Sequence, residues 1–172
     1  MTLFLTALSL IAFAANSLLA RLALADGSID PVSFTSLRLL SGMLMLIPIA
    51  WKLQEPATSS PWKNATLSGA ALFGYALAFS LGYVSITAGA GTLILVGAVQ
   101  VTMLGWALIQ GEKISPIKWM GSLISMAGLV YLVSPGISAP DPLGAGLMIL
   151  SGTAWGIYSI RGRGALSPIS MT

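Results

Sequence analysis

Apolar residues along this chain occur in long, nearly unbroken runs, separated by short segments rich in Pro, Gly, Asp and Lys. Each run has about 20 residues, the length that an α-helix needs to cross a hydrocarbon layer roughly 30 Å thick. The runs are apolar at consecutive positions, whereas strands of a membrane β-barrel alternate apolar and polar residues. The pattern therefore predicts an all-α integral membrane protein, because a helix satisfies its own backbone hydrogen bonds in lipid.

The polar segments divide the chain into six predicted transmembrane helices and the start of a seventh. These helices cover residues 3–24, 32–52, 66–86, 89–110, 116–134 and 143–160. The break near residues 83–91 carries no charge. We place it there because one apolar run over residues 65–110 is far too long for a single crossing.

The distribution of basic residues predicts the orientation of the chain. A cytoplasmic N-terminus leaves only Arg21 outside and places the basic residues of the other loops inside, namely Lys52, Lys63, Lys113, Lys118, Arg161 and Arg163. This division follows the positive-inside rule. No basic residue precedes the first apolar run, unlike in a cleaved signal peptide, so we expect the first helix to be retained. We predict a multi-pass protein of the inner or plasma membrane.

Composition narrows the possible chemistry. The chain is 56% hydrophobic and 8% charged, with a net charge of +3 and with neither Cys nor His. The lack of Cys and His excludes disulfides, thiol nucleophiles and the usual soft metal sites, and we expect no metal or cofactor. The basic residues are scattered at helix ends, so we expect no nucleic-acid partner. The predicted spans contain no Asp or Glu, and therefore neither an obvious proton carrier nor the paired acids or nucleophile–base pair of an enzyme.

Two short segments near the N-terminus recur in the same order further along the chain. Residues 13–21 (FAANSLLAR) align with residues 155–163 (WGIYSIRGR), and residues 31–35 match residues 168–172 at three of five positions. Five predicted helices separate the copies, so the second copy enters the membrane in the opposite direction, as in inverted-repeat transporters. We expect a first repeat over 1–136 and the truncated start of a second over 143–172, from a ten-helix (5+5) architecture.

Residues 83–136 resemble the fourth and fifth helices of EamA-like proteins of the drug/metabolite transporter superfamily. The turn Gly111-Glu112-Lys113 is the strongest part of the resemblance. Arg38 resembles the arginine of the family's second helix, and Trp155-Gly156 resembles the tryptophan–glycine pair that opens a repeat. The resemblance implies a ten-helix carrier that moves metabolites or drug-like solutes, with both termini in the cytoplasm.

Two positions depart from the family pattern. Phe13-Ala14 replaces the tryptophan–glycine pair in the first copy, and Val99-Gln100 stands where many members carry a proline in the fourth helix. These departures leave the family resemblance intact, and the resemblance implies no particular substrate for this chain.

Five side chains in the predicted helices are candidate solute contacts: Asn16, Arg38, Tyr75, Gln100 and Tyr158. A guanidinium seven residues into a span costs a few kcal/mol unless it finds a partner. Arg38 is therefore either an anion or carboxylate contact, or a structural arginine held by carbonyls or headgroups.

The other candidates also have two interpretations. The Asn16 amide binds a solute or a neighbouring helix, and the Gln100 amide suits a neutral polar solute if it faces a cavity. Tyr75 and Tyr158 are candidates for a pocket, whereas we expect Tyr83 and Trp106 to anchor helix ends in the membrane interface.

Other residues indicate structural roles. Glu112 beside Gly111 is expected to cap backbone N–H groups of the following helix or to pair with a loop cation. Small residues recur every four positions at Ala70, Gly74, Ala78 and Gly82, and again at Gly152 and Gly156. Such stripes predict close helix packing.

These observations favour a carrier that works by alternating access around a midplane cavity lined by the five candidates. Its expected partners are the bilayer, a small-molecule solute, and a second copy or a second half-transporter. We expect transport to need both repeats, so that the chain by itself is inactive or depends on a partner. The alternative is a non-transporting membrane subunit that uses the small-residue stripes to dock other helices.

Overall fold

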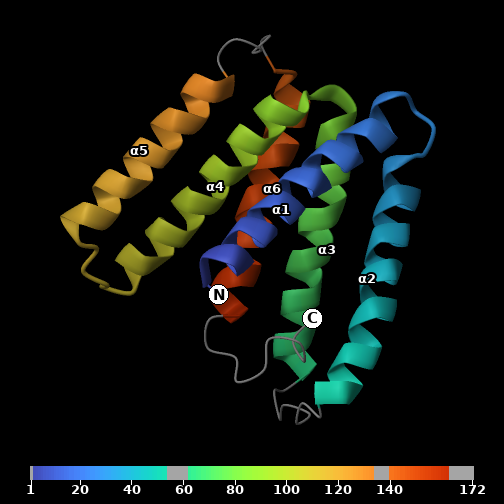
Figure 1. Cartoon of the computed structure of the whole chain (residues 1–172), viewed down its shortest axis with the longest axis horizontal. Helices are drawn as coiled ribbons and strands as arrows, with labels where there is room; N and C mark the ends of the chain where they lie inside the picture. The colour runs from blue at the N-terminus through green and yellow to red at the C-terminus, as the bar shows by residue number, and fades with distance from the viewer. Residues whose placement is uncertain (1, 54–61, 134–139, 163–172) are drawn as a thin grey trace.

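The computed structural model describes residues 2–53, 62–133 and 140–162, and these residues form six α-helices (Figure 1). The helices are α1 (Thr2–Ala25), α2 (Pro31–Leu53), α3 (Trp62–Ser85), α4 (Ala88–Ile109), α5 (Pro116–Val133) and α6 (Pro142–Gly162). All six predicted helices are confirmed, with ends within four residues of those expected. The seventh helix, Arg163 and the match at residues 168–172 lie outside the described residues.

Five of the described helices are long and apolar enough to cross a membrane: α1 over Leu3–Ala25, α2 over Pro31–Ile49, α3 over Thr66–Ser85, α4 over Ala88–Ile109 and α6 over Pro142–Gly162. Large apolar side chains face outward from the bundle, for example Leu3, Ile109 and Ile117, which are 87%, 79% and 77% exposed. A surface of this kind suits lipid and not water. The crossing by α5 and the ten-helix architecture stay predictions.

The turns between the helices follow from their own side chains. Asp30 directly precedes α2 and caps it, because its carboxylate accepts hydrogen bonds from the N–H groups of Val32 at 3.0 Å and Ser33 at 2.9 Å. A hydrogen bond from the Ser33 hydroxyl, followed by one from the Ser33 backbone, lowers the pKa of Asp30 below its usual 3.8. The uncharged break between α3 and α4 is confirmed, because Thr87 caps α4 by accepting from the N–H of Ala90.

The turn after α4 lies at Gly111, as predicted. Gly111 has φ +74°, a left-handed conformation that favours glycine, and the N–H of Glu112 donates to the carbonyl of Ala107 at 2.9 Å. The side chain of Glu112 makes no hydrogen bond or ion pair with the described residues. Ser115, not Glu112, caps α5 by accepting from the N–H of Lys118.

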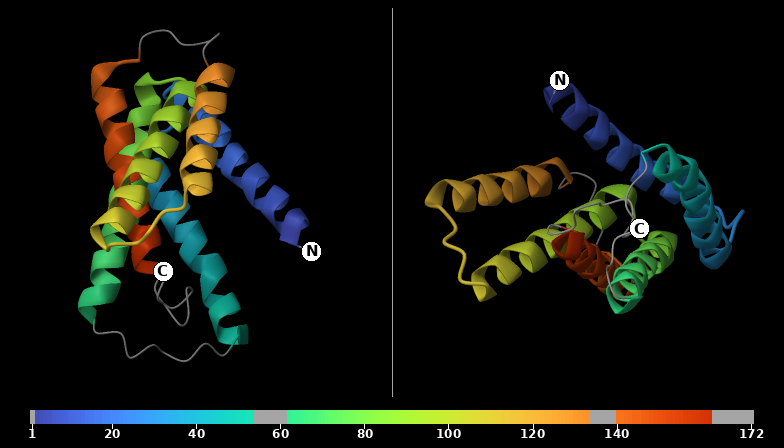
Figure 2. Two further views of the ribbon diagram at one scale, coloured as in Figure 1. Left: turned by 90° about the vertical axis from the view of Figure 1, so that its left-hand side faces the viewer. Right: turned by 90° about the horizontal axis from the view of Figure 1, so that it is seen from below.

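α6 is the central helix and packs most extensively against α3 and α4 (Figures 1 and 2). α2 and α1 pack beside α3, while α5 packs against the outer side of α4. The first half of α1 leans away from the other helices, as the left view of Figure 2 shows. α1 and α6 run in opposite directions along the bundle.

Glycines on one face of α6 permit this close packing. A Cβ at Gly152 would clash with the carbonyl oxygen of Leu95 and would lie 2.7 Å from the Cβ of Ala98. A Cβ at Gly156 would lie 2.8 Å from the Cβ of Thr102. The predicted packing step at Gly152 and Gly156 is therefore confirmed, and its partner is α4.

The predicted stripe on α3 is correct only in part. Ala78 is buried, and a Cβ at Gly82 would lie 3.0 Å from the side chain of Met148 on α6. Ala70 is exposed, however, and a Cβ at Gly74 would meet nothing within 4 Å. The predicted stripe therefore packs against a neighbouring helix only in the later part of α3.

The buried core lies at the end of the bundle where α1 and α3 finish. It includes Leu24, Phe79 and Tyr83. The expectation that Tyr83 lies in the membrane interface is wrong, because its side chain is 0% exposed and its hydroxyl is 3.0 Å from that of Thr92. Gly91 leaves room for this ring, since a Cβ there would lie 2.5 Å from it. Trp106, by contrast, is 43% exposed.

Candidate solute cavity

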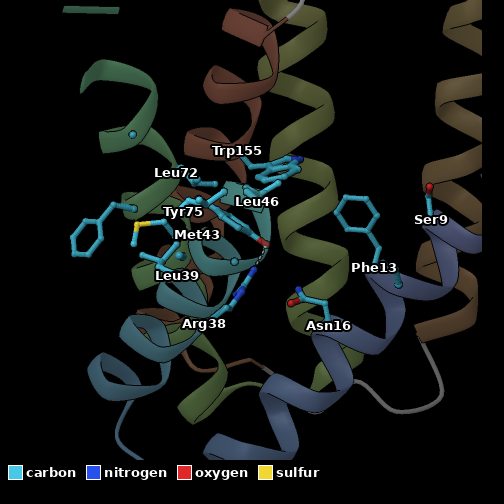
Figure 3. A pocket seen from close by; sticks show the side chains of 16 residues that line it. Ser9, Phe13, Asn16, Arg38, Leu39, Met43, Leu46, Leu72, Tyr75 and Trp155 are labelled. Carbon is cyan, nitrogen blue, oxygen red and sulfur yellow. Dashed lines mark hydrogen bonds between the residues drawn. The ribbon is translucent and has the colours of Figure 1, made fainter. Parts of the chain in front are cut away.

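A cavity of about 760 Å³ lies between α1, α2 and α3, with Trp155 of α6 in its wall (Figure 3). Its wall comes from residues 9–16 of α1, residues 38–47 of α2 and residues 69–76 of α3. These segments are the middle turns of α1, α2 and α3. The cavity therefore lies near the middle of the bundle and not at one of its ends.

On one side of the cavity, the bundle is closed by polar contacts between helix ends. The guanidinium of Arg21 donates to the carbonyl oxygens of Tyr83 at 2.6 Å and Val84 at 3.1 Å, which ties α1 to the end of α3. The hydroxyl of Thr35 on α2 is 2.8 Å from that of Ser80 on α3, and both residues are fully buried. This cluster of contacts closes the cavity on the side where α1 and α3 end.

Arg38 lies at the closed end of the cavity. Its Nη2 donates to the hydroxyl of Tyr75 at 3.0 Å. Its Cζ lies 5.4 Å from the ring centroid of Tyr75 and 4.9 Å from that of Phe79, within the range of a cation–π contact. Its Nη1 is buried and has no hydrogen-bond partner among the described residues. The guanidinium of Arg38 is thus held in place, but not all of its N–H groups have a hydrogen-bond acceptor.

Asn16 and aromatic rings complete the wall. Figure 3 shows Asn16 on α1 and Arg38 on α2 directed toward the same space. The rings of Phe13 and Trp155 meet edge to face with centroids 6.1 Å apart, and Trp155 lies 4.8 Å from the ring of Tyr75. Apart from Ser9, whose hydroxyl donates to the carbonyl of Leu5, the rest of the wall is apolar, and Arg38 is its one charged residue among those described.

Three of the five candidate residues meet at this cavity, and two do not. Asn16, Arg38 and Tyr75 line it. Tyr158 lies behind the wall, where its ring is 5.5 Å from that of Trp155. Gln100 lines neither this cavity nor an apolar groove of about 460 Å³ between α4, α5 and α6.

Phe13 and Trp155 are aromatic wall residues that were not among the five candidate contacts. The repeat alignment contained a signal for them, because Phe13 aligns with Trp155 and the two rings face one another. In the described part of the chain, no group of three or more acidic residues is placed to hold a metal ion.

Comparison with known proteins gives a consistent family match. The EamA-like transporter family matches residues 1–134. The chain is 50% identical to an uncharacterized protein of Pseudomonas aeruginosa over 171 residues, which is 99% of this chain and 59% of that protein. It is 30% identical to an uncharacterized transporter of Archaeoglobus fulgidus over 167 residues, 92% of this chain and 56% of that protein.

A third relative is the uncharacterized inner membrane transporter YedA of Escherichia coli. It is 25% identical over 144 residues, which is 82% of this chain and 47% of YedA. The chain thus spans about half the length of the curated relatives it matches. No solved structure matches it with statistical significance.

Proposed function

Because the chain belongs to the EamA-like transporter family, we propose that it forms the solute-binding part of a membrane carrier for a small metabolite or drug-like solute. The two relatives whose names describe a transporter support this proposal. In the proposal, the cavity between α1, α2 and α3 is the solute site, and Asn16, Arg38 and Tyr75 contact the solute.

The observation that carries the proposal is a cavity at the middle of the bundle that polar contacts close on one side. The cavity is large enough for a small metabolite, and the contacts of Arg21 and Thr35 close the bundle on the side where α1 and α3 end. A carrier that alternates between two openings needs this asymmetry in each of its states. With a cytoplasmic N-terminus, the closed side, where α1 ends, would be the outer side, so the state would be inward-facing.

The proposed carrier has two repeats in opposite orientation, of which α1–α5 form the first and α6 begins the second. The opposite directions of α1 and α6, and the contact between Phe13 and Trp155 at aligned positions, support this arrangement. Further helices, a second copy or a second half-transporter would complete the solute pathway.

The alternative, a non-transporting subunit, loses part of its support. It relied on small-residue stripes as free docking faces, but the face with Gly152 and Gly156 is already packed against α4. Only the start of the stripe on α3, at Ala70 and Gly74, stays unpacked.

Site-specific labelling tests the proposed orientation and cavity together, since the chain contains no Cys. Gly42→Cys introduces a thiol into the cavity wall, where an added Cβ meets nothing within 4 Å. Lys113→Cys and Ser28→Cys mark the inner and outer loops. An impermeant maleimide should label Gly42→Cys from the same side as Lys113→Cys. Labelling from the side of Ser28→Cys would contradict an inward-facing state.

Transport itself is tested in proteoliposomes that contain the purified chain and are loaded with an extract of small metabolites. Mass spectrometry follows which solutes leave the vesicles, and protein-free vesicles are the control. Where a second copy of the chain completes the solute pathway, we expect selective efflux of a few solutes, which labelling-blocked Gly42→Cys should reduce. Efflux no different from that of protein-free vesicles would contradict a carrier formed by this chain alone.

A further inference from the structure

The charge of Arg38 has no acidic counterpart in the cavity. The described acidic residues, Asp26, Asp30, Glu112 and Asp141, all lie between helices and none lines the cavity. Nη2 of Arg38 has only the neutral hydroxyl of Tyr75, and Nη1 has no partner among the described residues. A buried charge without a counter-ion is unfavourable in a membrane protein. An anionic solute would supply the missing partner.

We propose that the cavity binds an organic monoanion with an apolar, preferably aromatic, body, whose carboxylate or sulfonate group pairs with Arg38. This inference rests on the proposed function, in that the cavity is taken as the solute site. Asn16, which points into the same space, donates a further hydrogen bond to the anion. Nη1 is covered in the present conformation, and a rotation about the side-chain bonds of Arg38 brings it to the solute.

The wall of the cavity excludes the other charge classes. A cation is repelled by Arg38, and a zwitterion leaves its ammonium group without a carboxylate partner, because the described wall contains no acidic residue. A dianion such as phosphate meets only one cationic group. The apolar body is specified by the rings of Phe13, Tyr75 and Trp155 and by the aliphatic side chains of α2.

The test compares four probes that share one body and differ in charge. They are 3-phenylpropanoate, its neutral amide, the zwitterion phenylalanine and the cation 3-phenylpropylamine. Binding to the full chain in lipid nanodiscs is measured by equilibrium dialysis with radiolabelled probes. We expect the anion to bind about 10-fold or more tightly than the amide, since a hydrogen bond to a charged group contributes about that much.

Arg38→Gln should remove this preference, and Arg38→Lys should restore part of it because the positive charge is retained. The matched control is Lys118→Gln, which removes one positive charge from an exposed position outside the cavity. It should leave the ratio between anion and amide unchanged. Thermal unfolding of each variant in nanodiscs verifies that it is folded, and if Arg38→Gln does not fold, Arg38→Lys carries the comparison.

The inference is overturned if the amide or the zwitterion binds as tightly as the anion, or if Lys118→Gln reduces the preference as much as Arg38→Gln does. Such a result leaves the carrier proposal standing, provided that the metabolite efflux described above is observed. Conversely, preferential binding of the anion without any efflux supports the anion site and contradicts a carrier formed by this chain alone.

Discussion

Replacing Gly152 with alanine should separate α6 from α4. The added Cβ would lie 2.7 Å from the Cβ of Ala98, which is 0.7 Å short of the 3.4 Å at which ordinary contact begins. It would also clash with the carbonyl oxygen of Leu95, a backbone atom that cannot rotate aside. Because α6 must shift as a whole, we expect the overpacking to cost about 1–3 kcal/mol of unfolding free energy.

The matched control is Gly146→Ala on the same helix, where an added Cβ meets nothing within 4 Å. Both substitutions raise helix propensity by up to about 1 kcal/mol, so the difference between them isolates the packing cost. Unfolding in mixed micelles with increasing SDS, followed by tryptophan fluorescence, measures both free energies. Equal stability of the Gly152→Ala and Gly146→Ala variants would refute the assignment of Gly152 to a tight helix contact.

Two further predictions concern the ends of the helices. Arg21→Met removes both hydrogen bonds to the end of α3, including that to the carbonyl of Tyr83, and should lower the unfolding free energy by about 1.5–3 kcal/mol. The same SDS titration measures this loss, and Lys118→Met, which removes an exposed charge, should lose much less; equal losses would contradict the proposed closure. Asp30 has a lowered pKa in the folded chain, so its contribution is present above its usual pKa of 3.8 and is lost as the pH falls through the lowered value. Unfolding measured from about pH 5 to about pH 2 should show this decline, and Asp30→Asn should remove it; an identical decline in the variant would assign it to other groups.

The six helices could be predicted because each is encoded by its own apolar run and its own breakers. Even the uncharged break before α4 follows from the length of the apolar run alone, since residues 65–110 are too many for a single membrane crossing. The cap supplied by Ser115 was harder to predict, because Glu112 lies in the same short turn and offers the same chemistry.

The arrangement of side chains around the cavity could be predicted only in part, because it depends on how each helix is rotated. Gln100 lies two residues after Ala98, which faces α6, and at 3.6 residues per turn it therefore points to the opposite side of α4. The expectation that Tyr83 lies in the membrane interface is wrong for a related reason. Its position at a helix end is typical of an interfacial residue, but Gly91 provides a buried space for its ring.

The position of α6 divides the bundle into two groups of helices. Its glycine face lies close against α4, and its other main neighbour is α3, so these three helices pack together as one body. α1 and α2 are attached to that body through side chains, chiefly at their joined ends, by Arg21 and Thr35. In the proposed carrier, a rearrangement that opens the closed side would therefore move α1 and α2 relative to this body. The hydrogen bonds of Arg21 and Thr35 would have to break in that rearrangement.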